Sequence, residues 1–595
     1  MLSTIAPTMT AWQWRFDSEA MFAGVAASSD GSVVAGYNAY AGMSVRAAKR
    51  YPVGGVARLG AVARVYVVSV AEMRAAEAAA FAAGVSEARL QANAGSAVAA
   101  QARRLRPAGP VVVLAGGGNN GRDGWVAACQ LLREARPVRL YLTPRHSVAE
   151  EELGAFTALG GQPLLHGGAE TLDTLRGWLS EATLAIDGLL GIGGRGAPRP
   201  PISDVAALLN AVRAERRGAL LTLAIDVPSG IDADSGAAEG DCVQADATVV
   251  LGGLKQGLLR FPAAGRAGVL LAGDIGLPAS ALAAQPVRNL DRPQVMLEVP
   301  GRALNGHKGT FGRVVVLGGS PDYYGAPYLA GAAALRSGCG LLAFAANPAL
   351  QAVLAGLLPE ATYLVLPERA PIDGADRAAE LALDGLADAQ ALLVGPGLGR
   401  SVGARRLVGR VLRERAARRP DLPMVLDADA LYALAVEPGL LETTGPAVVL
   451  TPHHGEMARL VQRPAAEIAA GPWESALEAA QRWQAVVVLK GPFTVVAVPE
   501  GQAWVWPHAN PALATGGTGD VLAGTIAGLL AQGLSPGAAA RVGVYVHAAA
   551  AFEHLERAGA DLLLASDLPA AIARQLGRLR ADRGDLTIQR LGAWS

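Results

Sequence analysis

Short apolar runs alternate with longer Ala- and Leu-rich stretches along most of this chain, in two successive series. The first series has its runs at Val111–Ala115, Val138–Leu142, Leu184–Ile186, Leu220–Ile225 and Thr248–Leu251. The second begins near Gly312, with runs at Val314–Leu317, Leu341–Ala345, Leu392–Val394, Met424–Leu426, Val448–Leu450, Val486–Leu489 and Thr494–Val498. Fully apolar strands that alternate with helices are typical of parallel sheets covered on both faces. The pattern therefore predicts two α/β units in one polypeptide.

Chain length supports this division, because 595 residues are too many for a single hydrophobic core. Residues 1–65 show no sustained period and are expected to form a poorly ordered extension. The regular pattern runs over 66–278 and again over 298–576. Between them, 279–297 loses the rhythm and is interpreted as a linker, and the Arg-rich stretch 577–595 as a loose tail. Two units joined in this way are expected to be separable.

Composition restricts the partners and the compartment. Lys and Arg (52) balance Asp and Glu (52), which argues against nucleic acid or an acidic membrane surface as a partner. No apolar run reaches about 18 residues, so no membrane span is expected. Cys129, Cys242 and Cys339 fit no metal-binding spacing and are interpreted as small buried residues of a cytoplasmic protein.

Two glycine-dense motifs in the second series indicate phosphate chemistry. GPGLG spans Gly395–Gly399, and ATGGTGD spans Ala514–Asp520 directly before the helix-like run Val521–Gln532. Glycines let backbone N–H groups approach phosphate oxygens, and a helix N-terminus adds positive potential. Asp520 is then placed to take a proton from an attacking hydroxyl. No GK[ST] follows, so the motif is not a Walker A loop.

The first series carries a loop of the same kind, GGGNNGRDG at Gly116–Gly124, directly after an apolar run. Two further loops, Gly188–Gly196 and Val227–Asp232, also follow predicted strands, and ligands of open α/β sheets bind at such carboxyl ends. Asn120, Asp187 and Ser229 together offer oxygen ligands that suit a monovalent cation better than zinc. The alternatives are a structural turn for the glycines and helix N-capping for Asp187 and Asp226.

Residues 66–278 resemble the N-terminal (YjeF N-terminal) domain of the bifunctional NAD(P)H-hydrate repair enzymes. The similarity lies in AEMRAAE, LQANAG, GNNGRDG, IDGLLGIGG, IDVPSGID, the segment Ala245–Thr248 and Lys255. It implies a Rossmann-like three-layer α/β/α fold and an epimerase that interconverts the R and S forms of NAD(P)H hydrated at nicotinamide C6. Potassium would be held by Asn120, Asp187 and Ser229, and Asp226 would be catalytic. The implied substrate contacts are Asn119, Asn120, Gly121, Arg122, Asp123, Gly191, Ile192, Gly193, Gly194, Arg195, Gly196, Ala197 and Asp226.

Two positions depart from the family pattern. Ala92 stands where the family commonly has glutamate, and Arg122 replaces a glycine. Arg122 either strengthens the contact with phosphate or crowds the loop.

Residues 298–576 resemble the dehydratase domain of the same enzymes, which belongs to the ribokinase-like group. The similarity covers HKGTFGRVVVLGGS, GAPYLAGAAALRSGCGL, GPGLG, LDADAL, TPHHGEMARL, LKGPFT and NPALATGGTGDVLAG, in that order. It implies substrate contacts at Ala326, Gly397, His453 and Asp520, with Asp520 as the catalytic base. The implied nucleotide contacts are Lys490, Gly491, Pro492, Phe493, Thr494 and Gly519. His307 and Lys308 are also expected to meet phosphate charge, whereas His454, where the family has proline, is given no role.

The resemblance implies a combined kinase and lyase reaction. Phosphoryl transfer to the C6 hydroxyl would create a leaving group, and elimination would restore NAD(P)H. ADP or ATP would be the donor, ADP being favoured by the fused two-domain arrangement, and Mg²⁺ would bridge its phosphates. The family also suggests a homo-oligomer. The alternative is a ribokinase-like kinase of a small molecule such as a vitamin precursor, with a non-catalytic N-terminal binding domain.

Overall fold

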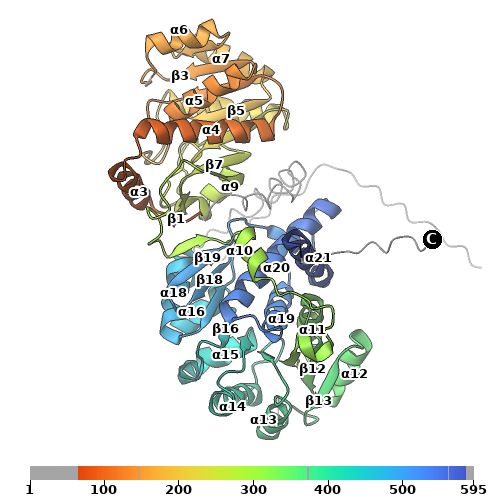
Figure 1. Cartoon of the computed structure of the whole chain (residues 1–595). Helices are drawn as coiled ribbons and strands as arrows, with labels where there is room; N and C mark the ends of the chain where they lie inside the picture. Colours follow the sequence, from red (N-terminus) through yellow and green to blue (C-terminus); the bar gives the residue numbers. More distant parts are fainter. Residues whose placement is uncertain (1–64, 147, 371–373, 560–561, 585–595) are drawn as a thin grey trace, which may run out of the picture.

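The chain forms two α/β units that follow one another along the sequence (Figure 1). The computed structural model describes residues 65–146, 148–370, 374–559 and 562–584. Of the expected extension 1–65, only Val65 lies within these ranges. In the described part of the chain, no helix is both long and apolar enough to cross a membrane.

The first unit is built on a parallel seven-stranded sheet in the order β4-β3-β2-β5-β6-β7-β9. The strands are β2 (Val111–Ala115), β3 (Val138–Leu142), β4 (Gln162–Leu165), β5 (Leu184–Gly188), β6 (Leu221–Ile225), β7 (Ala247–Leu251) and β9 (Val269–Gly273). The helices are α3 (Val70–Ala82), α4 (Glu87–Leu105), α5 (Asn119–Arg133), α6 (Glu150–Ala158), α7 (Ala169–Glu181), α8 (Ile202–Glu215) and α9 (Ala263–Ala267). A short strand pair, β1 (Val67–Val68) with β8 (Leu254–Lys255), and the 3-10 turn η2 (Gln256–Leu259) complete the unit.

The second unit contains a ten-stranded sheet in the order β10-β19-β18-β17-β16-β15-β14-β11-β12-β13, parallel except around β18. Its strands are β10 (Val287–Asn289), β11 (Arg313–Leu317), β12 (Leu341–Ala346), β13 (Thr362–Val365), β14 (Ala391–Val394), β15 (Met424–Leu426), β16 (Val448–Leu450), β17 (Val486–Leu489), β18 (Val495–Val498) and β19 (Gln502–Val505). Its main helices are α10 (Arg292–Glu298), α11 (Gly325–Ser337), α12 (Pro348–Leu357), α13 (Ala375–Asp384), α14 (Val402–Arg418), α15 (Asp429–Val436), α16 (His454–Val461), α17 (Ala465–Ala470), α18 (Pro472–Trp483), α19 (Thr518–Ala531), α20 (Pro536–Ala558) and α21 (Leu568–Arg583). Short 3-10 turns lie at η3 (Lys308–Phe311), η4 (Pro438–Thr443), η5 (Pro511–Leu513) and η6 (Ala565–Asp567).

Both sheets are buried on both faces, as the apolar runs predict. Along β2, Val111 and Val113 contribute to the core under α4 and α5, whereas Val112 and Leu114 contribute to the core under α7 and α8. Alternate side chains of a strand point to opposite faces, so each strand must be apolar throughout. The second sheet repeats this arrangement and gives the same three-layer architecture.

The segment 279–297, expected as a linker, carries regular structure that belongs to the second unit. β10 pairs in parallel with β19 at the sheet edge, and Asp291 caps α10, whose Pro293 occupies its first turn. Gln294 accepts a hydrogen bond from Trp504 Nε1 at 2.9 Å, and Val295 is fully buried. The interpretation as a linker is wrong for residues 287–297, because Pro293 marks the start of a helix rather than a break.

The tail also differs from expectation, since α21 continues to Arg583. Leu579 is buried, and Arg580 and Arg583 donate hydrogen bonds to the carbonyl oxygens of Pro300 and Val299. The arginines that suggested a loose tail form the polar face of an amphipathic helix. Residues 585–595 lie outside the described part of the chain.

The contacts of β10 and α10 predict where the second unit can be cut. A fragment covering 298–595 should melt about 10 °C below one covering 286–595, because it loses several buried apolar side chains worth about 1.5–3 kcal/mol each. It also loses the edge strand that covers β19. Thermal unfolding followed by circular dichroism measures the difference. Equal melting temperatures would show that β10 and α10 do not contribute to the fold.

Candidate active sites

The first site lies at the carboxyl ends of β2, β5 and β6. Strand order reverses here, because β2 pairs with β3 on one side and with β5 on the other. α5 begins directly after β2, and Gly118 is its N-cap, with open space where a side chain would stand. Gly121 is required for packing, since a Cβ would lie 2.0 Å from the carbonyl oxygen of Gly116. The open N-terminus of α5 is therefore available to an anion.

Asp226 directly follows β6 and is held by a buried lysine. Its backbone has φ +64°, a strained conformation for a residue other than glycine, and functional sites often contain such residues. Lys255 Nζ lies 2.5 Å from Asp226 Oδ1, and Leu251 N donates to the same oxygen at 3.0 Å. Only 1% of Lys255 is exposed. Lys255 and Leu251 thus fix one carboxylate oxygen of Asp226 in a buried environment.

Asp123, on the first turns of α5, lies near this pair. Burial raises the pKa of Asp123 to about 8, and the charges of Asp226 and Glu77 add to the rise. At neutral pH, Asp123 is therefore a neutral acid that can donate a proton. A proton donor near a second carboxyl group that is held by a lysine is suited to acid–base chemistry. The family resemblance implies only a substrate contact for Asp123, and it assigns no role to Lys255.

Asn120, Asp187 and Ser229 come together as predicted. Ser229 Oγ donates to Asp187 Oδ1 at 2.6 Å, and Ser229 N donates to Asp187 Oδ2 at 2.8 Å. The Asn120 amide donates to the carbonyl oxygens of Ile225 and Leu190. Neither Asp187 nor Asp226 caps a helix, so the N-capping alternative is wrong for the described helices.

The environment of Asp187 fits a monovalent cation. The residue is fully buried, and burial raises its pKa to about 6 although its hydrogen bonds to Ser229 and Leu189 oppose the rise. No lysine or arginine in the described ranges shifts this pKa. A buried carboxylate without a cationic side chain, beside hydroxyl and amide oxygens, is the donor set expected for such an ion.

The neighbouring loop 191–197 closes over Asn120, while Arg122 turns elsewhere. A Cβ on Gly191 would lie 2.5 Å from Asn120 Oδ1, so the loop approaches that side chain closely, and Gly193, Arg195, Gly196 and Ala197 are exposed. Arg122 forms two hydrogen bonds with Glu152 of α6, at 2.7 and 2.9 Å. In the structure the Arg122 guanidinium is engaged by a carboxylate, and its contact with phosphate stays a prediction.

The second site surrounds the N-terminus of α19. Gly517 is the N-cap with φ +90°, and Asp520 lies in the first turn. Burial raises the pKa of Asp520 to about 7, and Asp427 contributes to the rise. A carboxyl group with this pKa can accept a proton near neutral pH. Backbone donors and a base are therefore combined at one helix end.

Lys490 connects this helix end to the end of β15 and to α16. Its Nζ lies 2.7 Å from Asp427 Oδ1 and 3.8 Å from Glu456 Oε2, and a Cβ on Gly519 would lie 3.3 Å from Nζ. Burial works to lower the pKa of Lys490, but Asp427, Glu456 and Asp520 outweigh it, so the pKa is raised and the ammonium stays charged. Such a cation can meet phosphate.

Sequence reasoning assigned no roles to Asp427, Asp429 and Glu456. Asp427 is 1% exposed and also accepts a hydrogen bond from Thr451 Oγ1 at 2.7 Å. Asp429 accepts from Gly399 N at 2.9 Å and so joins GPGLG to LDADAL. The sequence did contain a sign of this site, because two aspartates follow the β15 run closely.

The other expected substrate residues also lie at this edge: Ala326 at the start of α11, Gly397 in the GPGLG loop and His453 directly before α16. A Cβ on Gly397 would lie 3.1 Å from that of Ala326, so these two residues are neighbours. His453 caps α16, its Nδ1 accepting hydrogen bonds from Gly455 N and Glu456 N. Burial and Lys490 lower the pKa of His453, so the ring is neutral. The structural role of His453 is thus visible, and its remaining nitrogen, Nε2, lies 3.6 Å from Glu456.

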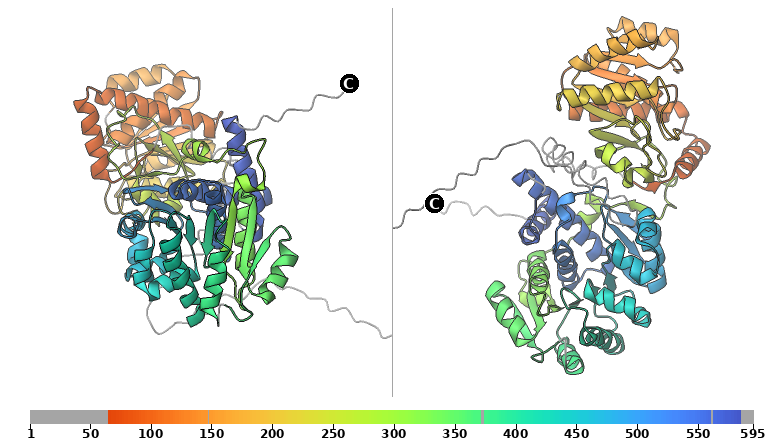
Figure 2. Two further views of the ribbon diagram at one scale, coloured as in Figure 1. Left: turned by 60° about the horizontal axis from the view of Figure 1, so that its bottom comes forward. Right: turned by 180° about the vertical axis from the view of Figure 1, so that it is seen from behind.

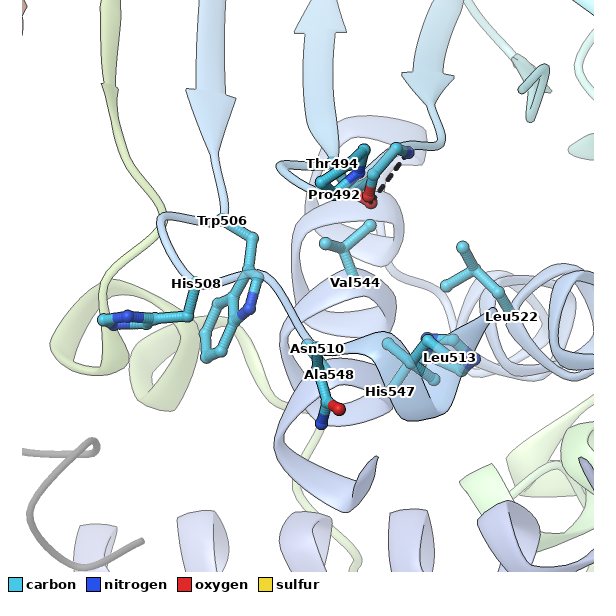
Figure 3. Close-up of a pocket in the computed structure, with 11 residues that line it drawn as sticks. Pro492, Thr494, Trp506, His508, Asn510, Leu513, Leu522, Val544, His547 and Ala548 are labelled. Carbon is cyan, nitrogen blue, oxygen red and sulfur yellow. Dashed lines mark hydrogen bonds between the residues drawn. The ribbon is translucent and has the colours of Figure 1, made fainter. Parts of the chain in front are cut away.

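A pocket lies beside Lys490 (Figure 3). Gly491, Pro492 and Thr494 line it from the β17–β18 turn, and residues of α19, α20 and the segment 506–513 line it from the other sides. Trp506 and Asn510 line it too, and among the described residues Trp506 Nε1 and Asn510 Nδ2 have no hydrogen-bond partner. Buried donors of this kind call for an acceptor-bearing ligand.

His307 and Lys308 lie elsewhere, contrary to expectation. They precede β11 and therefore lie at its amino end. The nearby Gly312 is in close contact with Ala531, because a Cβ on Gly312 would lie 1.9 Å from the carbonyl oxygen of Ala531. Ala531 ends α19, a helix of 14 residues, whose length is about 20 Å at 1.5 Å per residue. Asp520 is at the other end, so this motif does not reach the phosphate site within one chain.

Comparison with known proteins assigns a family to each unit. Residues 87–257 match the YjeF-related protein N-terminus, and residues 314–574 match the NAD(P)H-hydrate dehydratase family. The bifunctional NAD(P)H-hydrate repair enzyme Nnr of Moorella thermoacetica is 40% identical over 465 residues, covering 77% of this chain and 86% of the relative. Nnr of Escherichia coli is 34% identical over 469 residues, covering 78% and 84%. Among solved structures, the ADP/ATP-dependent NAD(P)H-hydrate dehydratase of Bacillus subtilis, co-crystallised with ATP and Mg²⁺, is 35% identical and covers 49% of this chain and 98% of that chain, with a TM-score of 0.42.

Proposed function

The chain belongs to the bifunctional NAD(P)H-hydrate repair enzymes, and we propose that it epimerises R and S hydrates of NAD(P)H and dehydrates the S form with ADP as phosphoryl donor. The observation that carries the dehydratase proposal is Asp520 at the open N-terminus of α19, beside the Lys490–Asp427 pair. Because the relatives match both units, a kinase with a non-catalytic first unit is not retained.

In the second unit, dehydration proceeds through a better leaving group. Asp520 takes the proton of the C6 hydroxyl as that oxygen attacks the terminal phosphorus of the nucleotide. Lys490 and the N–H groups at the start of α19 stabilise the phosphate charge. Elimination of phosphate, with loss of a proton from the adjacent ring carbon, then restores the dihydropyridine. Ala326, Gly397 and His453 form the wall against which the nicotinamide end of the hydrate lies.

The nucleotide lies along the β17–β18 turn, with its base in the pocket of Figure 3. The orphan donors Trp506 Nε1 and Asn510 Nδ2 support this placement, since a purine offers ring-nitrogen acceptors. Magnesium would be held by phosphate oxygens and water, with Asp427 and Asp520 as the carboxylates available to it, and it would neutralise phosphate charge.

In the first unit, epimerisation at C6 requires proton transfer at the hydroxyl oxygen. Either departure of that hydroxyl or opening of the ring needs a group that gives a proton and a group that accepts one. Asp123 is the neutral acid, and Asp226, oriented by Lys255, is the carboxylate. The N-terminus of α5 and the loop 191–197 bind the phosphates of the dinucleotide.

Potassium is proposed at Asn120, Asp187 and Ser229, where it would fix the loops that carry the substrate. Replacing Asp187 with alanine should reduce epimerisation and its stimulation by potassium, because the charged ligand is lost. Dehydration of pure S hydrate should remain. Epimerisation rates in potassium and in a potassium-free buffer measure this. If potassium stimulates the variant as strongly as the parent, the ion is bound elsewhere.

The dehydration rate should depend on pH through Asp520. Its pKa of about 7 means that the carboxylate needed as a base is lost on acidification, so kcat/KM for S hydrate should rise through neutral pH and level off above it. A profile measured between about pH 5.5 and 8.5 in saturating ADP tests the assignment. A rate that falls over this interval would exclude Asp520 as the base.

The direct test of the donor is an assay of the purified chain with hydrated NADH and either ADP or ATP, with and without magnesium. NADH absorbance should recover with ADP. The unpaired Cys129, Cys242 and Cys339 support the expected cytoplasmic location. Assembly into a homo-oligomer remains a prediction from the family.

A further inference from the structure

Phe493 belongs to the nucleotide turn but faces away from the nucleotide pocket. Of the turn, the pocket is lined by Gly491, Pro492 and Thr494, whereas Phe493 is 9% exposed and lies against the first unit. Its ring centroid is 6.0 Å from that of Phe261, which follows η2. One side of this turn therefore faces the ligand, and the other side faces the epimerase unit.

A second contact lies beside the aromatic pair. The guanidinium of Arg260 stands over the ring of Trp473, 5.3 Å from its centroid, and Trp473 is buried on α18. Phe493 and Trp473 share one buried apolar cluster with residues of the first unit, among them Leu258 and Leu259. The segment 258–261 is thus packed against both the turn and the helix beside it.

Backbone hydrogen bonds tie the same segment to the sheet of the second unit. β8 pairs with β1, and Tyr66 next to β1 forms an antiparallel bridge with Arg288 of β10. Val65 N donates to Asn289 Oδ1 at 3.1 Å, and Asn289 N donates to Val65 O at 2.9 Å. β10 then pairs with β19, the partner of β18, which begins where the nucleotide turn ends. Figure 1 shows β1, α10 and β19 together at this junction.

We propose that Phe261 is a positioning residue for nucleotide binding, so that the epimerase unit holds the dehydratase's Lys490–Thr494 turn in its binding conformation. A mobile turn must be ordered when the ligand binds, and that entropic cost lowers affinity. The first unit orders the turn beforehand through the Phe261–Phe493 contact. This inference rests on the proposed nucleotide role of the turn.

The test uses the full-length chain with Phe261→Ala. The KM for ADP in S-hydrate dehydration, and the Kd for ADP by calorimetry, should rise about 3- to 10-fold, the change expected for loss of one aromatic pair. The kcat at saturating ADP and the epimerisation rate should stay within about twofold, because no catalytic group moves. Phe261→Leu, which keeps an apolar contact, should restore most of the affinity.

Phe81→Ala is the matched control, since Phe81 is 45% exposed on α3 and Phe261 is 50% exposed. It should leave the affinity for ADP unchanged. If the parent binds no ADP, the nucleotide site itself is wrong. If the parent binds ADP and Phe261→Ala binds it equally well, only the positioning role is overturned. An equal loss in Phe81→Ala would also overturn it, because the effect would then be a general loss of stability.

Discussion

Replacing Asp520 with asparagine should slow dehydration of S hydrate by about 10²–10⁴-fold, the usual contribution of a positioned general base. Asparagine has nearly the same shape but cannot accept the hydroxyl proton. Lys490 and the N-terminus of α19 remain, so calorimetry should find ADP bound with nearly unchanged affinity. Initial rates of NADH recovery with pure S hydrate measure the effect.

Asp384→Asn is the control, since Asp384 is an exposed carboxylate of α13, far along the chain from these motifs. It should behave as the parent. Removing the charge of Asp520 also relieves repulsion with Asp427, so the asparagine variant should not melt earlier. Turnover of the variant near the parental rate would assign the base to another residue.

Replacing Asp226 with asparagine should slow epimerisation by about 10²-fold or more, because the carboxylate held by Lys255 is lost. Lys255→Met should have a similar effect and should also lower the melting temperature, since it leaves the buried Asp226 without a cationic partner. Epimer ratios followed by chromatography measure both variants.

Dehydration of pure S hydrate should stay within about twofold in both variants. Lys308→Met is the control for loss of a lysine, because Lys308 lies on an exposed turn at the amino edge of the second sheet. If epimerisation survives in Asp226→Asn, the acid–base pair has been misassigned.

The strands of the fold could be predicted from sequence almost to the residue where they are buried on both faces. The runs Val111–Ala115 and Val138–Leu142 are β2 and β3 without change. Edge strands such as β4 and β13 were not predicted, because they are half exposed and carry both polar and apolar side chains. Short apolar runs show burial, and edge strands lack that signal.

The errors at the junction have a different cause. α10 and the end of α21 are stabilised by each other and by α20, through contacts between residues nearly 300 positions apart. Arg541 of α20 forms an ion pair with Glu298 of α10 at 2.6 Å, and no local sequence pattern predicts this contact. Local composition therefore suggested loose chain where tertiary packing orders it.

The sites were located by their glycines and aspartates, but their electrostatics needed the fold. Asp123 and Asp520 owe their raised pKa values to burial beside Asp226 and Asp427, residues distant in sequence. The misplaced His307–Lys308 motif is a different error, since its position directly before the β11 run already indicated the amino edge of the sheet. The ion pair of Arg122 also could not be predicted from the sequence, because its partner Glu152 lies on another helix.

One measurement tests the division of labour most directly: recovery of NADH from pure R hydrate and from pure S hydrate, with ADP and magnesium, by the parent and the two aspartate variants. The parent should convert both epimers completely. Asp226→Asn should convert S hydrate rapidly but R hydrate only at the rate of spontaneous epimerisation, and Asp520→Asn should convert both about 10²–10⁴-fold more slowly than the parent. Rapid conversion of R hydrate by Asp226→Asn would contradict the account, because the first unit would then not be the epimerase.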